Sequence, residues 1–286
     1  MEVPLLKKKS HWLLLLPGLL LILLFLVLPI LRIVVPTFFG DGGLTLKGYT
    51  DFLGDSFYQK IFLRTIRVAL VTSLICVVLA LPVAFYISRM KSSRKGIMIA
   101  LATFPLLTNT VVRAFAWIAI LGREGILNNL LMKLGLVEEP LKLLYTEGAI
   151  VVGSVYLFLP IMLTSLVGVM ENISDETLEA AQSLGANRFV SFLKVVVPLS
   201  MPGVIVGSVL VFAGTASAYS TPLMLGGNKN MMMSTLIYQQ AMLLDNWTRA
   251  SVIATVMIVT SYLVVGALNT IADKLGEKAL RRGKER

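Results

Sequence analysis

The segment SDETLEAAQSLGANRFVSFLKVVVP occupies residues Ser174 to Pro198 and is the only long polar interruption between two very apolar stretches. Ser174 is suited to cap a helix, and the two acidic residues after it lie in the first turn, where the helix dipole favours negative charge. Gly185 suits the left-handed position that ends a helix. Asn187 can cap a second helix, and Pro198 marks a boundary at which the chain can change direction. The segment therefore predicts a short helix, a sharp turn and a second helix beside a membrane.

The rest of the chain is far more apolar than a soluble protein. Of its 286 residues, 56% are hydrophobic and only 15% are charged, and the mean hydropathy is +0.82. A helix needs roughly 20 residues to cross about 30 Å of hydrocarbon. Six stretches are long enough, namely 12–31, 68–87, 96–122, 148–170, the front of 195–228, and 250–272. We predict an all-α polytopic membrane protein in which residues 12–272 form six transmembrane helices between the tails 1–11 and 273–286.

The basic residues sort by side of the membrane. With the N-terminus in the cytoplasm, 15 of the 26 lysines and arginines fall on the cytoplasmic side, six in outer loops and five in or beside the spans. The cytoplasmic clusters are Lys7 to Lys9, four residues within 89–95, Arg188 with Lys194, and six residues within 274–286. The positive-inside rule therefore predicts that both termini and the polar segment lie in the cytoplasm. Because the net charge of +10 is explained by this sorting, we expect no nucleic acid partner.

The polar segment also carries a spaced motif. Glu179-Ala180-Ala181 is followed after three residues by Gly185, and after nine more by Val195-Val-Val-Pro198. This resembles the EAA loop of binding-protein-dependent ABC transporter permeases, whose pattern is EAA, three residues, G, nine residues and I-x-L-P. Val195 and Val197 replace the isoleucine and the leucine, which are apolar side chains of similar volume. We call residues 171–197 the EAA loop.

The resemblance implies a type I ABC importer permease fold in a bacterial inner membrane. In that family the EAA loop seats in a cytoplasmic ATPase, which here would involve Glu179, Ala180, Ala181 and Gly185. The implied partners are two ATPase copies, a second permease that is similar or identical, and an extracytoplasmic solute-binding protein. The stretch from Pro105 to Trp117 resembles the corresponding segment of the polyamine-type (spermidine and putrescine) permeases, and the chain as a whole resembles the polyamine and opine branch. A small polar solute, such as a polyamine, an opine or an amino-acid-like compound, is therefore expected.

Candidate residues for the translocation path come from two places. The third predicted span contains Pro105, which can kink it, and Asn109 and Arg113, which share a helix face. Either this face lines the path, or Arg113 lies near the outer interface and extends its charge into water. Ser217 and Tyr219 follow in a stretch rich in small and hydroxyl residues and are further candidates.

Three glycines of the fifth predicted span, Gly203, Gly207 and Gly214, fall on one helix face. Such a face favours close helix packing over pore lining. After these glycines, we predict that residues 221–248 form a helix at the outer mouth of the path. We also predict that residues 36–60 form an outer loop.

The chain lacks the residues that most catalytic sites need. Its single histidine, His11, leaves no histidine triad or histidine metal cluster, and no phosphate-binding Gly-rich loop with Lys-Ser/Thr occurs. We therefore expect no catalytic residue, metal or cofactor, and ATP hydrolysis on another chain. A self-sufficient carrier or channel is the main alternative, although the predicted spans contain no carboxylate for proton or sodium coupling. An intramembrane scaffold or enzyme is the third reading. Transport by the purified chain alone would favour the carrier.

Overall fold

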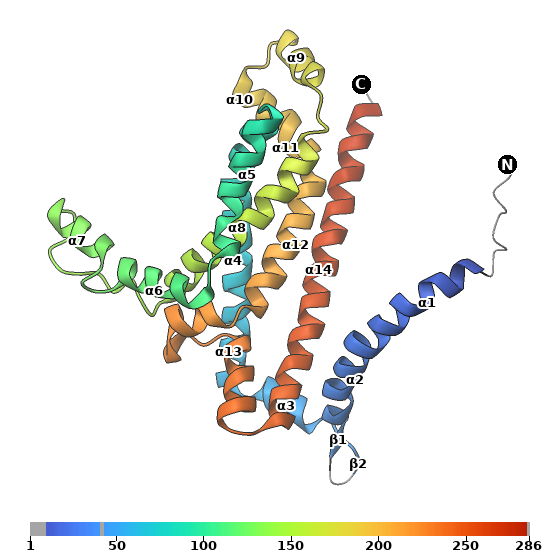
Figure 1. Ribbon diagram of the computed structural model, residues 1–286, viewed down its shortest axis with the longest axis vertical. Coiled ribbons are helices and arrows are strands. Elements are labelled where there is room, and N and C mark those ends of the chain that lie inside the picture. Colours follow the sequence, from blue (N-terminus) through green and yellow to red (C-terminus); the bar gives the residue numbers. More distant parts are fainter. Residues whose placement is uncertain (1–9, 41–42, 285–286) are drawn as a thin grey trace.

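The structure, a computed structural model, describes residues 10–40 and 43–284. Its centre is a bundle of α4 (Ser56–Ser88), α8 (Glu147–Met170) and α12 (Met201–Ser217). Two further helices pack on this bundle, α5 (Ser92–Leu107) against α8 and α14 (Trp247–Lys284) against α12. Figure 1 shows α9 (Asp175–Ser183) and α10 (Arg188–Ser191) at one end, and α3 (Lys47–Gly54) and α13 (Met233–Tyr238) at the other. We call these the α9 end and the α3 end.

The main hydrophobic core lies where α4 meets α8. Small side chains of α4, those of Cys76, Ala80 and Ala84, are fully buried and belong to the same cluster as Met162 and Leu166 of α8. Small residues allow two helices to approach closely, and the larger side chains of α8 fill the remaining space. The α4 and α8 pair is therefore the most extensively packed part of the bundle.

Two arms leave the bundle in different directions (Figure 1). The first is continuous and consists of α1 (Ser10–Ile22), η1 (Leu23–Val27), α2 (Leu28–Val34) and η2 (Val35–Phe38). The short strands β1 (Phe39–Gly40) and β2 (Gly43–Leu44) follow it as an antiparallel pair in which Phe39 lies opposite Leu44. The second arm consists of α6 (Thr110–Leu121) and α7 (Ile126–Lys133). Both arms expose large apolar side chains, so each presents a surface suited to lipid or to another membrane subunit.

The predicted six-span fold is confirmed. Four helices are long and apolar enough to span a membrane alone, and the described residues reach six spans when each of two bent helix pairs counts as one. The four are Leu16–Phe38, Ser56–Ser88, Glu147–Met170 and Trp247–Thr270. The bent pairs are Ser92–Leu107 with Thr110–Lys133, at 93°, and Arg188–Leu199 with Met201–Ser217, at 66°. The kink that Pro105 predicts is thus a sharp break, located just after it at Thr108.

Several predicted boundaries differ from the structure. The predicted loop 36–60 contains α3 and the start of α4, because Asp55 caps α4 by accepting a hydrogen bond from the Phe57 backbone N–H at 2.8 Å. The predicted outer helix 221–248 is divided into η4 (Pro222–Gly226), η5 (Asn228–Asn230), α13 and η6 (Gln239–Leu243), with Gly227 at a positive φ of 63° as one interruption.

The structure describes only part of each predicted tail. Of the N-terminal tail 1–11, residues 1–9 with the predicted cytoplasmic lysines lie outside the described residues, and Ser10 and His11 begin α1. At the other terminus, α14 continues without a break from the sixth predicted span to Lys284.

Candidate functional site

The first leg of the EAA loop has the predicted caps. The Ser174 side chain accepts a hydrogen bond from the backbone N–H of Thr177 at 3.4 Å, and Asp175 and Glu176 lie in the first turn of α9. Gly185 has a φ of +88°, a conformation that L side chains adopt only with strain. Its backbone N–H donates to the carbonyl of Gln182 at 2.9 Å and closes the helix end.

The second leg returns to the bundle through a change of direction. Asn187 caps α10 by accepting a hydrogen bond from Val190 N–H at 2.8 Å, as its position predicts. The chain continues through η3 (Phe192–Val196) and α11 (Val197–Leu199), and bends by 66° before α12 begins at Met201. Pro198 is the second residue of α11, and the change of direction that it predicts follows at Ser200. The buried hydroxyl of Ser200 donates to the Val196 carbonyl at 2.7 Å and holds this bend.

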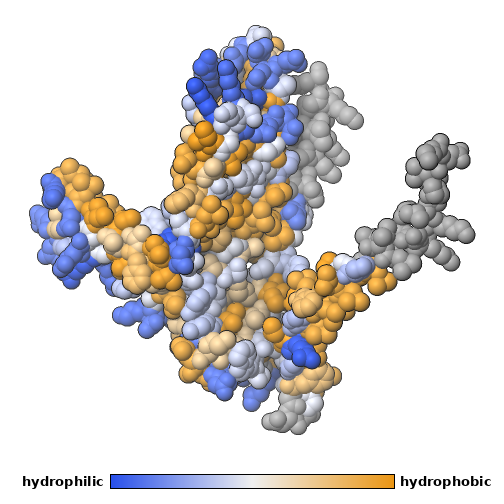
Figure 2. Space-filling view, viewed as in Figure 1, coloured by the Kyte–Doolittle hydropathy of each residue, from blue (hydrophilic) through white to orange (hydrophobic). Residues whose placement is uncertain are grey.

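The tip of the EAA loop presents apolar side chains away from the bundle. No residue of α9 is buried, and Glu179, Ala180 and Gly185 are exposed while Ala181 is half-buried. Leu184 is 89% exposed and Phe189 is 69% exposed. Figure 2 shows that hydrophilic side chains predominate at this end of the molecule, in contrast to the hydrophobic flanks of the bundle. Two large apolar side chains on an otherwise polar tip are typical of a docking surface for a soluble protein.

Basic residues at the end of α4 and in the first turn of α5 hold the loop, a role that the sequence pattern does not reveal. Arg89 Nη1 donates to the carbonyl oxygen of Ile173 at 2.8 Å and lies 2.9 Å from Oδ1 of Asp175. Lys95 Nζ lies 2.9 Å from Oε1 of Glu171. The sequence identified both basic residues only as cytoplasmic charges, because nothing in the linear pattern pairs residues about 80 positions apart.

The break in the third span positions Asn109 and Arg113. Asn109 is the N-cap of α6, where its side chain accepts from the backbone N–H of Val111 at 2.8 Å, and it is exposed. Arg113 lies one turn into α6 and points back toward the end of α5, donating to the Pro105 carbonyl at 3.0 Å. Asn109 therefore caps α6, while Arg113 bonds the end of α5. The two side chains do not form one face of a continuous helix.

Ser217 and Tyr219 lie where α12 ends. The Ser217 hydroxyl is exposed and donates to the Ala213 carbonyl at 2.8 Å. The ring of Tyr219 lies 4.6 Å, centroid to centroid, from the ring of Tyr238 in α13. Tyr238 was not among the sequence candidates, since the pairing depends on how α13 folds back. Within the described residues no hydrogen bond joins this pair to Asn109 or Arg113.

The three glycines of α12 all face α8. A Cβ on Gly203 would lie 3.0 Å from the Ser165 carbonyl oxygen, and one on Gly214 would lie 2.5 Å from Cε1 of Phe158. A Cβ on Gly207 would overlap the Met162 side chain. The absence of a Cβ at these positions leaves room for the backbone and side chains of α8, so the three glycines lie at the contact between the two helices.

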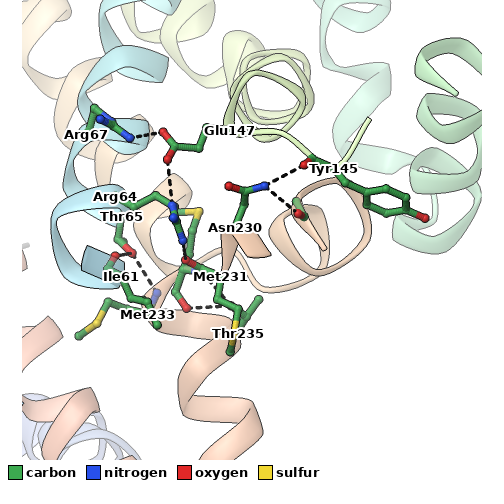
Figure 3. Close-up of polar contacts among 12 residues, drawn as sticks. Ile61, Arg64, Thr65, Arg67, Tyr145, Glu147, Asn230, Met231, Met233 and Thr235 are labelled. Carbon is green, nitrogen blue, oxygen red and sulfur yellow. Dashed lines mark hydrogen bonds and ion pairs between the residues drawn. The ribbon is translucent and has the colours of Figure 1, made fainter. Parts of the chain in front are cut away.

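An ion-pair network joins three segments near the α3 end (Figure 3). Arg64 of α4 donates from Nε to Oε1 of Glu147, the first residue of α8, at 2.9 Å, and from Nη1 to the Met231 carbonyl at 3.2 Å. Arg67 bonds the other carboxylate oxygen of Glu147. Asn230, which directly precedes Met231, donates to the Tyr145 carbonyl at 2.8 Å. The sequence identifies these arginines only as charges in or beside a span and does not predict that they meet Glu147.

The described residues contain no group of three or more histidine, cysteine, aspartate or glutamate side chains that could hold a metal ion. What they do contain is a bundle of apolar spans with a capped helix-turn-helix at one end. This arrangement agrees with the membrane-spanning fold and the EAA loop that the sequence predicts.

The chain belongs to the family of binding-protein-dependent transport system inner membrane components, whose family model matches residues 8–275. It is similar to the spermidine/putrescine transport system permease protein PotB of Escherichia coli (strain K12), with 29% identity over 263 residues, which cover 88% of this chain and 95% of PotB. The molybdenum transport system permease protein ModB of Azotobacter vinelandii is 31% identical over 207 residues, covering 71% of this chain and 89% of ModB.

The fold is also that of a solved transporter. A chain of a bacterial ABC transporter involved in the import of the acidic polysaccharide alginate aligns with a TM-score of 0.77 at 17% identity, covering 93% of this chain and 96% of that chain. A second solved structure, of a bacterial alginate ABC transporter in complex with an alginate pentasaccharide-bound periplasmic protein, aligns with a TM-score of 0.77 at 17% identity, covering 94% of this chain and 96% of that chain. The chain is therefore the permease component of an ABC importer.

Proposed function

We propose that the chain is one of two permease subunits of an ATP-driven importer in a bacterial inner membrane, with the EAA loop and both termini in the cytoplasm. It is not itself an enzyme, and ATP is hydrolysed by two copies of a cytoplasmic ATPase docked on the EAA loops. The observation that carries this proposal is the tip of the EAA loop, where Leu184 and Phe189 are exposed beside the polar helix α9. A partner that covers these side chains removes apolar surface from water.

The matched control for the docking role is Leu134, which is 63% exposed at the end of α7 on the second arm. We expect Leu184→Glu to lose the ATPase on co-purification from detergent-solubilised membranes, and Leu134→Glu to retain it. Equal retention by both variants would contradict docking through the EAA loop.

The orientation of the chain in the membrane can be tested separately. Reporter fusions after Lys95 and after Arg286 should both report cytoplasm, since the basic residues concentrate on that side. An external signal at either position would contradict the proposed topology.

The proposed cargo is a small polar solute delivered by an extracytoplasmic binding protein, and a polyamine is the first choice because of the similarity to PotB. Opines and amino-acid-like compounds are the other classes to compare. We place the path near Ser217 and Tyr219, with Asn109 and Arg113 at the α5–α6 break as the further candidate lining. The paired rings of Tyr219 and Tyr238 support a cationic solute, because an aromatic face attracts an ammonium group.

We propose that the path binds its solute weakly and leaves selection to the binding protein. Mass spectrometry of the small molecule held by the co-purified binding protein tests the solute class, and a polyamine is the expected result. A competition series of polyamines, amino acids and opine-like acids on wild type and Arg113→Ala tests where selection occurs. A changed rank order in the variant would show that the path itself selects.

A further inference from the structure

The last turn of α4 contacts both legs of the EAA loop. On the entry leg, Arg89 bonds Ile173 and Asp175 through Nη1, as described above. The Arg89 guanidinium also lies 5.4 Å from the ring centroid of Phe85, one helical turn earlier. That ring lies 5.4 Å from the ring of Phe192 in η3, on the exit leg. Phe85 and Arg89 together form what we call the α4 clamp, which connects both legs of the EAA loop to α4.

The bonding of Arg89 is unusual for a residue that only stabilises a loop. Its ion-pair partner Asp175 is 73% exposed at the side chain, and such exposed pairs contribute little to stability. Its Nε and Nη2 are buried without a hydrogen-bond partner in the described residues. Buried donors without acceptors are unfavourable, so this position of the guanidinium is not its best-satisfied one. A clamp residue with unused donors is suited to changing partners when the loop moves.

α4 connects this clamp to the opposite end of the molecule. It is a single helix of 33 residues, which corresponds to a length of roughly 50 Å. Along this length it packs on α8 through the buried core described above. At its far end, Arg64 bonds the Met231 carbonyl and Thr65 Oγ1 accepts the Met233 backbone N–H at 2.9 Å (Figure 3). We call residues 226–236 the distal segment.

We propose that Arg89 is a positioning residue that transmits movement of the EAA loop along α4 to the distal segment. The inference rests on the function proposed above, because the movement originates in the ATPase. α4 and α8 act as one rigid unit, since Glu147 joins them near the α3 end and Arg89 joins α4 to the residues after α8 at the α9 end. Without Arg89 the loop still docks, but its movement no longer reaches the distal segment.

The test is hydrogen exchange measured by mass spectrometry on the assembled complex of this chain with its ATPase, with and without ATP and vanadate. In wild type, nucleotide is expected to change exchange in both the EAA loop and the distal segment. In Arg89→Ala, the response of the loop is expected to remain, and that of the distal segment to fall at least fivefold. Arg89→Lys keeps a positive charge beside the Asp175 carboxylate. It is expected to restore part of the nucleotide-dependent change in exchange of the distal segment. Arg94→Ala is the control, because Arg94 is exposed in the first turn of α5 and makes no ion pair within the described residues.

The outcomes separate the two proposals. A normal distal response in Arg89→Ala would overturn transmission through Arg89. Loss of the loop response or of the bound ATPase in Arg89→Ala would also overturn it, by showing that the residue only shapes the docking surface. A wild-type complex in which only the loop responds would rule out transmission along α4. Absence of the ATPase from the wild-type preparation would contradict the proposed function, and the transmission role with it.

Discussion

Arg113 donates a hydrogen bond from Nη1 to the carbonyl oxygen of Pro105, at 3.0 Å, across the 93° break between α5 and α6. Weaker contacts at 3.4 Å reach the Thr108 carbonyl and the Thr110 hydroxyl. The positive charge therefore lies at the C-terminal end of α5, where the helix dipole favours a cation. The sequence allows Arg113 either to line the path or to reach the outer interface. In the structure its guanidinium instead bonds the end of α5 at the break.

We expect Arg113→Ala to destabilise the membrane domain by about 1–3 kcal/mol, because the carbonyl oxygens of Pro105 and Thr108 both lose a charged donor. Thr108 still donates to Pro105 at 2.8 Å, so the break itself persists. Thermal unfolding of the purified chain in detergent is the measurement, and Arg113→Lys should recover part of the loss. An unchanged unfolding temperature in Arg113→Ala would show that the side chain does not support the break.

The turn at Gly185 gives a prediction about coupling. A Cβ at this position meets nothing within 4 Å, so Gly185→Val introduces backbone strain of about 1–2 kcal/mol without a clash. We expect the variant to fold but to lose the ATPase or to hydrolyse ATP without transport, because the tip of the EAA loop is displaced.

Gly135→Val is the matched control for this strain. Gly135 also has a positive φ, +69°, and open space around it, but it follows α7 on the second arm. ATPase association and uptake should be normal in this variant. The role of the Gly185 turn would be refuted if both variants behaved alike.

The glycine face of α12 predicts an order of stabilities. In Gly203→Val the new side chain meets the Ser165 backbone carbonyl, which cannot move aside, so we expect a loss of about 1–3 kcal/mol. Gly266→Val, in α14 with nothing within 4 Å of its Cβ, should be close to wild type. Unfolding temperatures and membrane yields of the two variants decide the matter, and equal values would argue against a packing role.

The ion-pair network around Glu147 predicts that alanine substitutions of its members change stability by unequal amounts. Glu147→Ala leaves Arg64, whose side chain is only 19% exposed, without its carboxylate, and we expect a loss of about 1–3 kcal/mol. Arg67 is 65% exposed, so Arg67→Ala should change stability by no more than about 0.5 kcal/mol. Denaturation of both variants at the same salt concentration measures the difference. A larger effect for Arg67→Ala would mean that the exposed pair carries the network.

Much of the site was predictable because its signals are local. Ser174, Gly185 and Asn187 act through hydrogen bonds and backbone angles within a few residues of themselves, so their caps and turn follow from spacing. The spans were predictable for a similar reason, since the length of an apolar run is set by membrane thickness. Pro105 predicts a kink in the third span, but it does not predict the 93° angle of the break.

Sequence alone determined the class of the chain, its six spans and the helix-turn-helix at one end, because these depend on composition, run length and neighbouring residues. Only the tertiary structure decided that Arg113 turns back to Pro105, that Arg64 meets Glu147, and that Arg89 holds the EAA loop through Ile173 and Asp175. The last two contacts join residues more than 80 positions apart, and which charge meets which depends on how α4 packs against α8. That packing is set by the shapes of side chains on two distant helices, which a linear pattern does not encode.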